Sequence, residues 1–455
     1  MDGPRLDRGG TVEGPRLDRG GTVVGTAIGP WRDRGWDGEE WRSHVGGGGR
    51  VRRMAMRDVR MHVRRANAHA GGWRRSRSVG TSGTRRCTEA RSDVVGLGQA
   101  MVDLAAHVDD AFLAKHALVK GERKVITHLE RAHILDDLDG SRYHATAGGS
   151  LANTLVALAQ LGRGRVDVCM AGAVGSDAIG QYFCAQMDQS DVTYLHVDRP
   201  DTYTGTVCVL ITPDAQRTML SCVGSSSTWV MPPSLQARIA RAKVLLIEGY
   251  LWEMEGTSRA IQVAVAWARR HRTAVAVTAS DVTVVRRHRR AFMDLLPHVD
   301  VLFANFAEAR ALAQGDTAHA CAARLGRTCE FVVVTDGPRG AHVVAHGRRH
   351  HVPPHRHALP LVDTCGAGDA YAAGVLYGMC VDMDVATMAH VGACVAGVVL
   401  AQTGARLSRD DADRLVSTCT WEGWTTDVQE GMEEEDGRDA RDVRRRPRLH
   451  ASCAR

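Results

Sequence analysis

The sequence predicts an α/β fold, because strand-like apolar runs and segments with helical spacing alternate with glycine turns. Phe331–Thr335 is a short apolar run typical of a buried parallel strand, and it ends in a glycine turn. Leucines recur at helical spacing from Leu151 to Leu161, and Gly162 follows as a stop signal. A length of 455 residues suits one large α/β domain or two smaller ones.

Composition excludes several classes of protein. The chain is 44% hydrophobic, as expected for a globular core, and its longest apolar runs are too short to span a membrane. The short apolar runs predict no membrane partner. The net charge of +6 is concentrated in residues 50–91 and 441–455, so we also expect no nucleic-acid partner. The 12 cysteines form no Cys-x-x-Cys pair, which favours reduced thiols and a cytoplasmic location.

Both ends of the chain are expected to be disordered. Residues 3–12 are repeated at 14–23, but two polar copies cannot bury a shared core. Residues 1–91 are therefore predicted to be a disordered Arg/Gly-rich extension. From Met54 onward this extension is rich in Arg and Ser, so organelle import or translation upstream of the true start are alternatives. Opposite charge blocks predict a second disordered tail at 427–455.

Asp363 to Asp369 is the stretch with the clearest chemical content. Its sequence, Asp-Thr-Cys-Gly-Ala-Gly-Asp, precedes a segment of small and apolar residues that suits a helix. Amide groups of a glycine turn at a helix start can hold an anion, and a carboxylate beside that anion can act as a base. Phosphoryl transfer to a hydroxyl is one interpretation. A glycine turn that caps a core helix is the other, and the stretch alone favours neither.

Two further segments carry polar groups within apolar surroundings. Asp103 lies in an apolar extended run, where a carboxylate can accept hydrogen bonds from two vicinal hydroxyls. The pattern alone favours an exposed position on a half-buried strand. Gly148 and Gly149 precede a helical segment, and Asn153 lies one turn into it. This arrangement is compatible with a polyol site or with a plain helix start.

Residues 93–407 resemble the ribokinase (PfkB) family of carbohydrate and nucleoside kinases through short motifs that occur in the order of that family. The motifs are Asp103, Gly148-Gly149 with Asn153, Gly172 to Gly180, Thr204-Gly205, Asn305 with Glu308, Thr335 with Gly337 and Gly340, and Asp363 to Asp369. The resemblance implies a kinase domain over 93–418 with a doubly wound, mostly parallel sheet flanked by helices. It also implies a small β lid built from about 102–124 and 202–221.

The resemblance implies a role for each matching residue. Catalysis would use Asp369 as base and the backbone of Gly366, Ala367 and Gly368 as an anion hole. The acceptor would contact Asp103, Gly148, Gly149 and Asn153. ATP, as co-substrate, would lie along Thr335, Gly337, Gly340, Asp363 and Thr364. Asn305 and Glu308 would organise Mg²⁺ through bound water molecules, since Mg²⁺ usually keeps several waters of hydration in protein sites.

The family often has Asn-Glu-x-Glu where this chain has Asn305-Phe306-Ala307-Glu308, so one acid is missing. The stretch from Val94 to Asn153 is similar to the adenosine-kinase branch, which favours a ribonucleoside acceptor. A sugar kinase of the same family and a non-catalytic ligand-binding protein are the alternatives. We expect a monomer or a homodimer.

Histidines crowd the stretch from His346 to His357. Clustered histidines can bind metal, but nothing in their spacing defines a tetrahedral site. The sequence therefore favours no metal site there.

Overall fold

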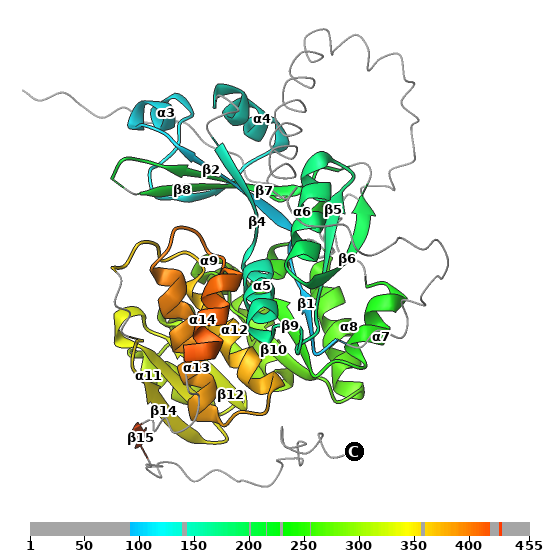
Figure 1. Cartoon of the computed structure of the whole chain (residues 1–455), viewed down its shortest axis with the longest axis vertical. Helices are drawn as coiled ribbons and strands as arrows, with labels where there is room; N and C mark the ends of the chain where they lie inside the picture. The colour runs from blue at the N-terminus through cyan, green and yellow to red at the C-terminus, as the bar shows by residue number, and fades with distance from the viewer. Residues whose placement is uncertain are drawn as a thin grey trace, which may run out of the picture. The chain divides into compact units, whose positions relative to one another are not determined.

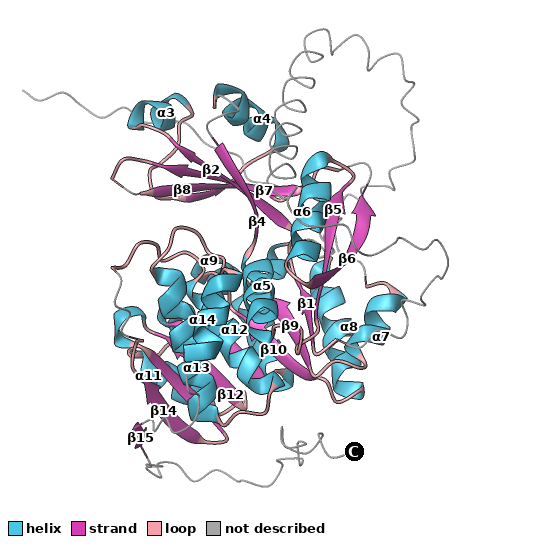
Figure 2. Ribbon diagram, in the orientation of Figure 1, coloured by secondary structure: helices cyan, strands magenta, loops and turns pink. Residues whose placement is uncertain are grey.

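The computed structural model describes residues 92–138, 143–199, 202–214, 216–227, 231–254, 256–355, 360–418 and 427–429. The predicted N-terminal extension and all but three residues of the predicted tail lie outside these ranges. Two sheets organise the described residues, a large sheet and a small sheet (Figures 1 and 2).

The large sheet has ten strands in the order β15-β14-β13-β12-β11-β10-β9-β1-β5-β6. Seven strands run parallel: β1 (Val94–Leu97), β5 (Val168–Gly175), β6 (Val192–Arg199), β9 (Val244–Glu248), β10 (Ala274–Thr278), β11 (Val301–Asn305) and β12 (Phe331–Thr335). Antiparallel strands extend one edge: β13 (Ala341–Ala345), β14 (Arg348–Val352) and β15 (Asp427–Gln429). The chain order reverses between β1 and β9, which is where open α/β sheets bind ligands.

Both faces of the large sheet are buried. Alternate residues of β1 show this directly, because Val94 belongs to one apolar core and Val95 to the other. One core includes residues of α5 (Ser150–Gly162), α6 (Ala178–Gln189), α12 (Ala367–Cys380), α13 (Val385–Leu400) and α14 (Arg409–Thr418). The other includes residues of α7 (Pro233–Ile239), α8 (Thr257–Arg270), α9 (Val282–Leu295), α10 (Phe306–Ala313) and α11 (Ala318–Leu325). Short 3-10 turns are η1 (Gly224–Ser227), η2 (Gly249–Glu253), η3 (Leu296–His298) and η4 (Gly337–Arg339).

The small sheet has the order β3-β8-β7-β2-β4. Its strands are β2 (Met101–His107), β3 (Arg123–Val125), β4 (Tyr143–Gly148), β7 (Gly205–Ile211) and β8 (Arg217–Cys222). Two helices accompany it, α3 (Asp110–Lys115) and α4 (His128–Asp137). β1 belongs to the large sheet and β2 to the small one, so the chain crosses between the two sheets within a few residues.

The doubly wound α/β fold and the second, smaller sheet confirm the predicted fold class. Local differences have physical causes. The segment expected to be extended over 102–124 contains α3, whose start is capped by the Asp109 carboxylate accepting from the Phe112 N–H. Within the predicted disordered tail, Asp427–Gln429 pairs with β14, because an edge strand offers free backbone groups. Across the described residues we find no helix with the length and apolar character of a membrane span.

Candidate active site

A cavity of about 600 Å³ lies at the carboxyl ends of the parallel strands, next to the β1/β9 reversal. Its walls include Gln99, just after β1, and the last residues of β9 and β11, Glu248 and Asn305. Small-sheet side chains, among them Met101 and Arg217, line it as well. Cavities at such reversal points are the usual ligand sites of this fold class.

The glycine turn predicted to bind an anion stands at the start of α12. Gly366 is the residue that precedes the helix and has φ 75°, in the left-handed region that favours glycine. A Cβ at this position would collide with Ala405. Gly368 is exposed and lines the cavity, with nothing within 4 Å of where its Cβ would stand. The first-turn N–H groups of α12 therefore face a space that can hold an anion.

Asp369 lies in the first turn of α12, half-buried in the wall of the cavity. Its Oδ1 accepts a hydrogen bond from the Ser150 hydroxyl at 2.6 Å. Burial raises the pKa of Asp369 to about 6, although hydrogen bonds from Ser150 and Asn153 oppose that rise. A carboxylate in this range can accept a proton near neutral pH.

Asp103 lines the same cavity from β2 of the small sheet. Gly148 makes room for it, because a Cβ at Gly148 would collide with the Asp103 carboxylate. Burial raises the pKa of Asp103 to about 6, the charge of Arg406 lowers it, and the charge of Asp369 raises it further. Two carboxylates with raised pKa thus face one cavity, a pattern typical of functional sites.

Arg406 contributes positive charge to the cavity from the segment between α13 and α14. Its Nε and Nη2 are buried and have no hydrogen-bond partner among the described residues. Burial lowers the pKa of Arg406 to about 10, while Tyr182 and Asp103 oppose that shift. Buried guanidinium nitrogens without a hydrogen-bond partner cost free energy of folding, which favours a ligand as the partner of Nε and Nη2.

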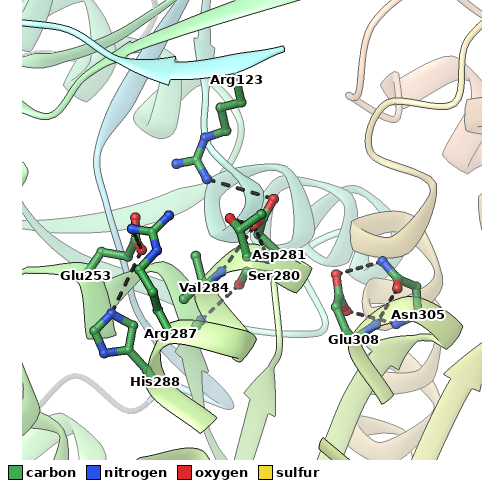
Figure 3. Close-up of polar contacts among 11 residues, drawn as sticks. Arg123, Glu253, Ser280, Asp281, Val284, Arg287, His288, Asn305 and Glu308 are labelled. Atoms are coloured by element: carbon green, nitrogen blue, oxygen red, sulfur yellow. Dashed lines mark hydrogen bonds and ion pairs between the residues drawn. The ribbon is translucent and has the colours of Figure 1, made fainter. Parts of the chain in front are cut away.

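Asn305 and Glu308 bond to each other at the start of α10 (Figure 3). The Glu308 carboxylate accepts from the Asn305 backbone N–H at 2.9 Å and from its Nδ2 at 2.7 Å. In return, the Asn305 Oδ1 accepts from the Glu308 N–H at 3.0 Å. Both side chains also line the cavity. Burial raises the pKa of Glu308 to about 7, and the charges of Asp281 and Asp369 raise it as well.

A second interaction drawn in Figure 3 links the small sheet to the start of α9. Arg123 of β3 lies 3.9 Å from the carboxylate of Asp281, the residue that caps α9. Its guanidinium also stacks over the Tyr250 ring, 4.6 Å from the centroid. Arg123 and Tyr250 both line the cavity, so this cation–π contact is made in the wall of the candidate site.

The structure brings most of the predicted site residues to the cavity. Those that line it are Asp103, Gly149, Asn153, Asn305, Glu308, Thr335, Asp363, Thr364, Gly366, Gly368 and Asp369. Those that do not are Gly148, Gly337, Gly340 and Ala367. Gly148 leaves room for the Asp103 carboxylate because it has no side chain, and Ala367 is the first residue of α12. Gly337 and Gly340 lie at the η4 turn that follows β12.

Sequence reasoning missed several polar residues of the cavity. Glu248 is almost fully buried at the end of β9 and accepts from the Gln99 N–H at 2.7 Å and the Leu151 N–H at 3.1 Å. Burial raises its pKa to about 7. Ser150 stood inside the Gly-Gly-x-x-x-Asn motif and could have been noticed there. Arg406 follows a plain glycine turn, and no local signal marked it.

A doubly wound α/β sheet combined with a small sheet over a carboxylate-lined cavity defines the ribokinase-like class. The chain belongs to the pfkB family of carbohydrate kinases, whose family model matches residues 125–412. The family predicted from the motifs is therefore confirmed.

Relatives within the family include nucleoside kinases. Guanosine-inosine kinase of Escherichia coli is 26% identical over 261 residues, covering 55% of this chain but only 59% of the relative. Adenosine kinase of Dictyostelium discoideum is 22% identical over 324 residues, covering 68% of this chain and 94% of the relative.

Solved structures at higher identity also match. A probable sugar kinase from Rhizobium etli is 30% identical with a TM-score of 0.65, covering 72% of this chain and 99% of that one. The adenosine kinase from Sinorhizobium meliloti is 30% identical with a TM-score of 0.65, covering 72% and 100%.

Proposed function

We propose that the chain is a kinase that transfers the γ-phosphoryl group of ATP to a primary hydroxyl of a ribonucleoside or a sugar. The observation that carries this proposal is Asp369, a carboxylate with a raised pKa in the first turn of α12, beside a glycine turn that opens on a 600 Å³ cavity. A base and an anion hole side by side are what phosphoryl transfer to an alcohol requires.

In the proposed reaction, Asp369 takes the proton of the acceptor hydroxyl. The oxygen forms a bond to the γ-phosphorus as the bond from that phosphorus to the β-phosphate oxygen breaks, and ADP leaves. Amides of the Gly366–Gly368 turn would hold the transferred group, whose negative charge suits a helix start. Ser150 would orient the base through its 2.6 Å hydrogen bond.

The acceptor would be held by groups on both sheets. Asp103 can accept from two hydroxyls, and Asn153 offers a donor and an acceptor. Gly149, with φ 93°, lets a ligand approach the backbone just before α5. ATP would lie along Thr335, Gly337, Gly340, Asp363 and Thr364, of which Thr335, Asp363 and Thr364 line the cavity.

The residues present fit a magnesium ion. Glu308 is a buried carboxylate whose pKa is raised by burial and by the charges of Asp281 and Asp369, so a cation among these groups would relieve their repulsion. Glu308 and Asn305 would hold Mg²⁺ through its waters. When bound, the ion would neutralise phosphate charge. Phe306, where the family often has an acid, is half-buried and packs on an apolar core.

Both nucleoside and sugar acceptors have support. Relatives are called guanosine-inosine kinase, adenosine kinase and probable sugar kinase. The N-terminal similarity to the adenosine-kinase branch favours a ribonucleoside, with its 5′-hydroxyl as the acceptor group. A sugar acceptor of ribose or fructose type is the second candidate.

The test is ADP release from ATP and Mg²⁺ with adenosine, inosine, guanosine, ribose and fructose in turn. Asp369→Asn should lower kcat at least about a hundredfold while keeping ATP affinity, since a general base contributes about 10²–10⁴. Asp413→Asn is the matched control, because Asp413 is half-buried, lies outside the cavity and pairs with Arg163 at 2.9 Å. Ligand binding without ADP release from any acceptor would overturn the proposal in favour of a non-catalytic protein.

A further inference from the structure

A group of metal-ligating side chains lies outside the candidate active site. His390 and Cys394 are four residues apart on α13, so they share one face of that helix. His355 reaches the same place from the segment after β14, which lies against α13. None of the three lines the active-site cavity.

The distances within this triad are those of a ligand set. Cys394 Sγ lies 3.4 Å from His355 Nδ1 and 3.3 Å from His390 Nε2. The three ligand atoms all lie within 4.8 Å of one another. In tetrahedral zinc sites, with Zn–S of about 2.3 Å and Zn–N of about 2.0–2.1 Å, a sulfur and a nitrogen ligand stand roughly 3.5 Å apart. Both sulfur–nitrogen edges already have that length.

Packing holds the three side chains in place. Cys394 is 1% exposed, and both histidines are half-buried. The His355 ring lies close to α13 at Gly397, where an added Cβ would stand 3.0 Å from its Cδ2.

Hydrogen bonding and a bound cation both account for the short contacts of Cys394, but they place different demands on the protons of the triad. A thiol has one proton, so Cys394 can donate to only one imidazole, and the other contact needs a ring N–H pointing at sulfur. A thiolate bound to a cation approaches both nitrogens without that restriction. Thiolate and imidazole are both ligand types that suit zinc.

We propose that His355, His390 and Cys394 bind a zinc ion, with water in the fourth position. Among the described residues, no further His, Cys, Asp or Glu joins the triad. On binding, the Cys394 thiol releases its proton to solvent and the thiolate bonds to the metal. The ion would fasten the start of the segment that leads to Asp363–Asp369 onto α13, which packs against α12. The site does not depend on the proposed kinase activity.

The experiment is a cobalt titration of the chelator-treated full chain. Tetrahedral Co²⁺ bound to a thiolate gives a charge-transfer band in the near ultraviolet and intense visible bands. Zn²⁺ should displace the Co²⁺ ion, so that both sets of bands disappear. Cys394→Ser should abolish the charge-transfer band. His390→Gln should weaken binding by at least the roughly 10–100-fold that loss of an outer partner costs.

Matched controls are Cys184→Ser, on α6, and His346→Gln, whose ring pairs with Glu330 at 2.8 Å. Both should keep the wild-type spectrum. A second measurement is the melting temperature, which Zn²⁺ should raise for the wild type but not for His390→Gln. Absence of the charge-transfer band in the wild type, or a band that survives in Cys394→Ser, would overturn the zinc site.

Discussion

Arg217 and Asp363 join the small sheet to the segment that precedes α12. The Arg217 Nη1 lies 2.6 Å from Asp363 Oδ1. Asp363 also accepts from the Cys365 N–H at 2.8 Å and from the Gly404 N–H at 2.9 Å. Burial alone would raise the pKa of Asp363, but Arg217 and the two amides outweigh it and hold the pKa below its ordinary value. One carboxylate therefore organises three segments of the cavity wall.

Arg217→Met should lower kcat/KM by about 10–100-fold, because a displaced anion turn would misplace the transferred group. Arg217→Lys should recover only part of the loss, since an ammonium cannot reproduce the planar fork. Steady-state kinetics with the best acceptor would measure both. The control is Arg163→Met, which removes an exposed arginine paired with Asp413. Equal kinetics for Arg217→Met and this control would rule out a role of Arg217 in placing the anion-binding turn.

The pH dependence of kcat/KM should follow the cavity carboxylates. Asp369 must be deprotonated to act as base, and its pKa is about 6, as is that of Asp103. Activity should therefore fall as the pH drops from 7 through 6, more steeply than one group would produce. Asp103→Asn should leave a residual activity with a single-proton slope. A profile flat down to pH 4.5 would contradict the assignment of Asp369 as base.

Local patterns predicted much of the fold. Phe331–Thr335 is a strand with those bounds, because a central strand buried on both sides reads as a continuous apolar run. The leucines at helical spacing from Leu151 to Leu161 likewise predicted a helix, which the structure shows as α5. The short helices α3 and α4 were missed, since a few turns beside a small sheet carry too little periodicity to be read.

Some residues of the candidate site could be predicted from a local motif, and others could not. The glycine turn and Asp369 are contiguous in sequence, so the motif exposes them. Glu248 and Arg406 line the cavity because the fold brings the end of β9 and the segment between α13 and α14 to it. Glu248 caps amides that are 149 and 97 residues away along the chain, at Gln99 and Leu151. Contacts at such separations leave no local pattern, and a single sequence cannot reveal them.

Asp369→Asn should be more stable than the wild type at neutral pH. The folded pKa of about 6 exceeds the ordinary value of 3.8, so the folded state loses stability as the pH rises from 4 to above 6. An amide avoids that loss, which amounts to roughly 1–3 kcal/mol. Thermal melts at pH 7.5 and pH 4.5 would measure it. The gain in stability of Asp369→Asn over the wild type should be present at pH 7.5 and small at pH 4.5. A variant that is less stable than the wild type at both pH values would show that Asp369 has a structural role.

Arg406→Met should separate ligand binding from stability. The Arg406 guanidinium is buried with Nε and Nη2 unpartnered among the described residues, so its removal should leave the melting temperature unchanged or raise it. The acceptor KM should rise about tenfold or more, as expected when a hydrogen bond to a charged group is lost. Because the charge of Arg406 lowers the pKa of Asp103, the acid limb of the pH profile should also move to higher pH.

Arg324→Met is the control for this variant. Arg324 is an arginine of α11 that bonds the Gln314 carbonyl at 2.7 Å, and it does not line the cavity. Its replacement should leave the acceptor KM and the acid limb at wild-type values. If Arg406→Met lowered the melting temperature and left the acceptor KM and the acid limb unchanged, Arg406 would be a packing residue. A raised acceptor KM with a displaced acid limb and an undiminished melting temperature requires instead that Arg406 and Asp103 act on the acceptor as a charged pair.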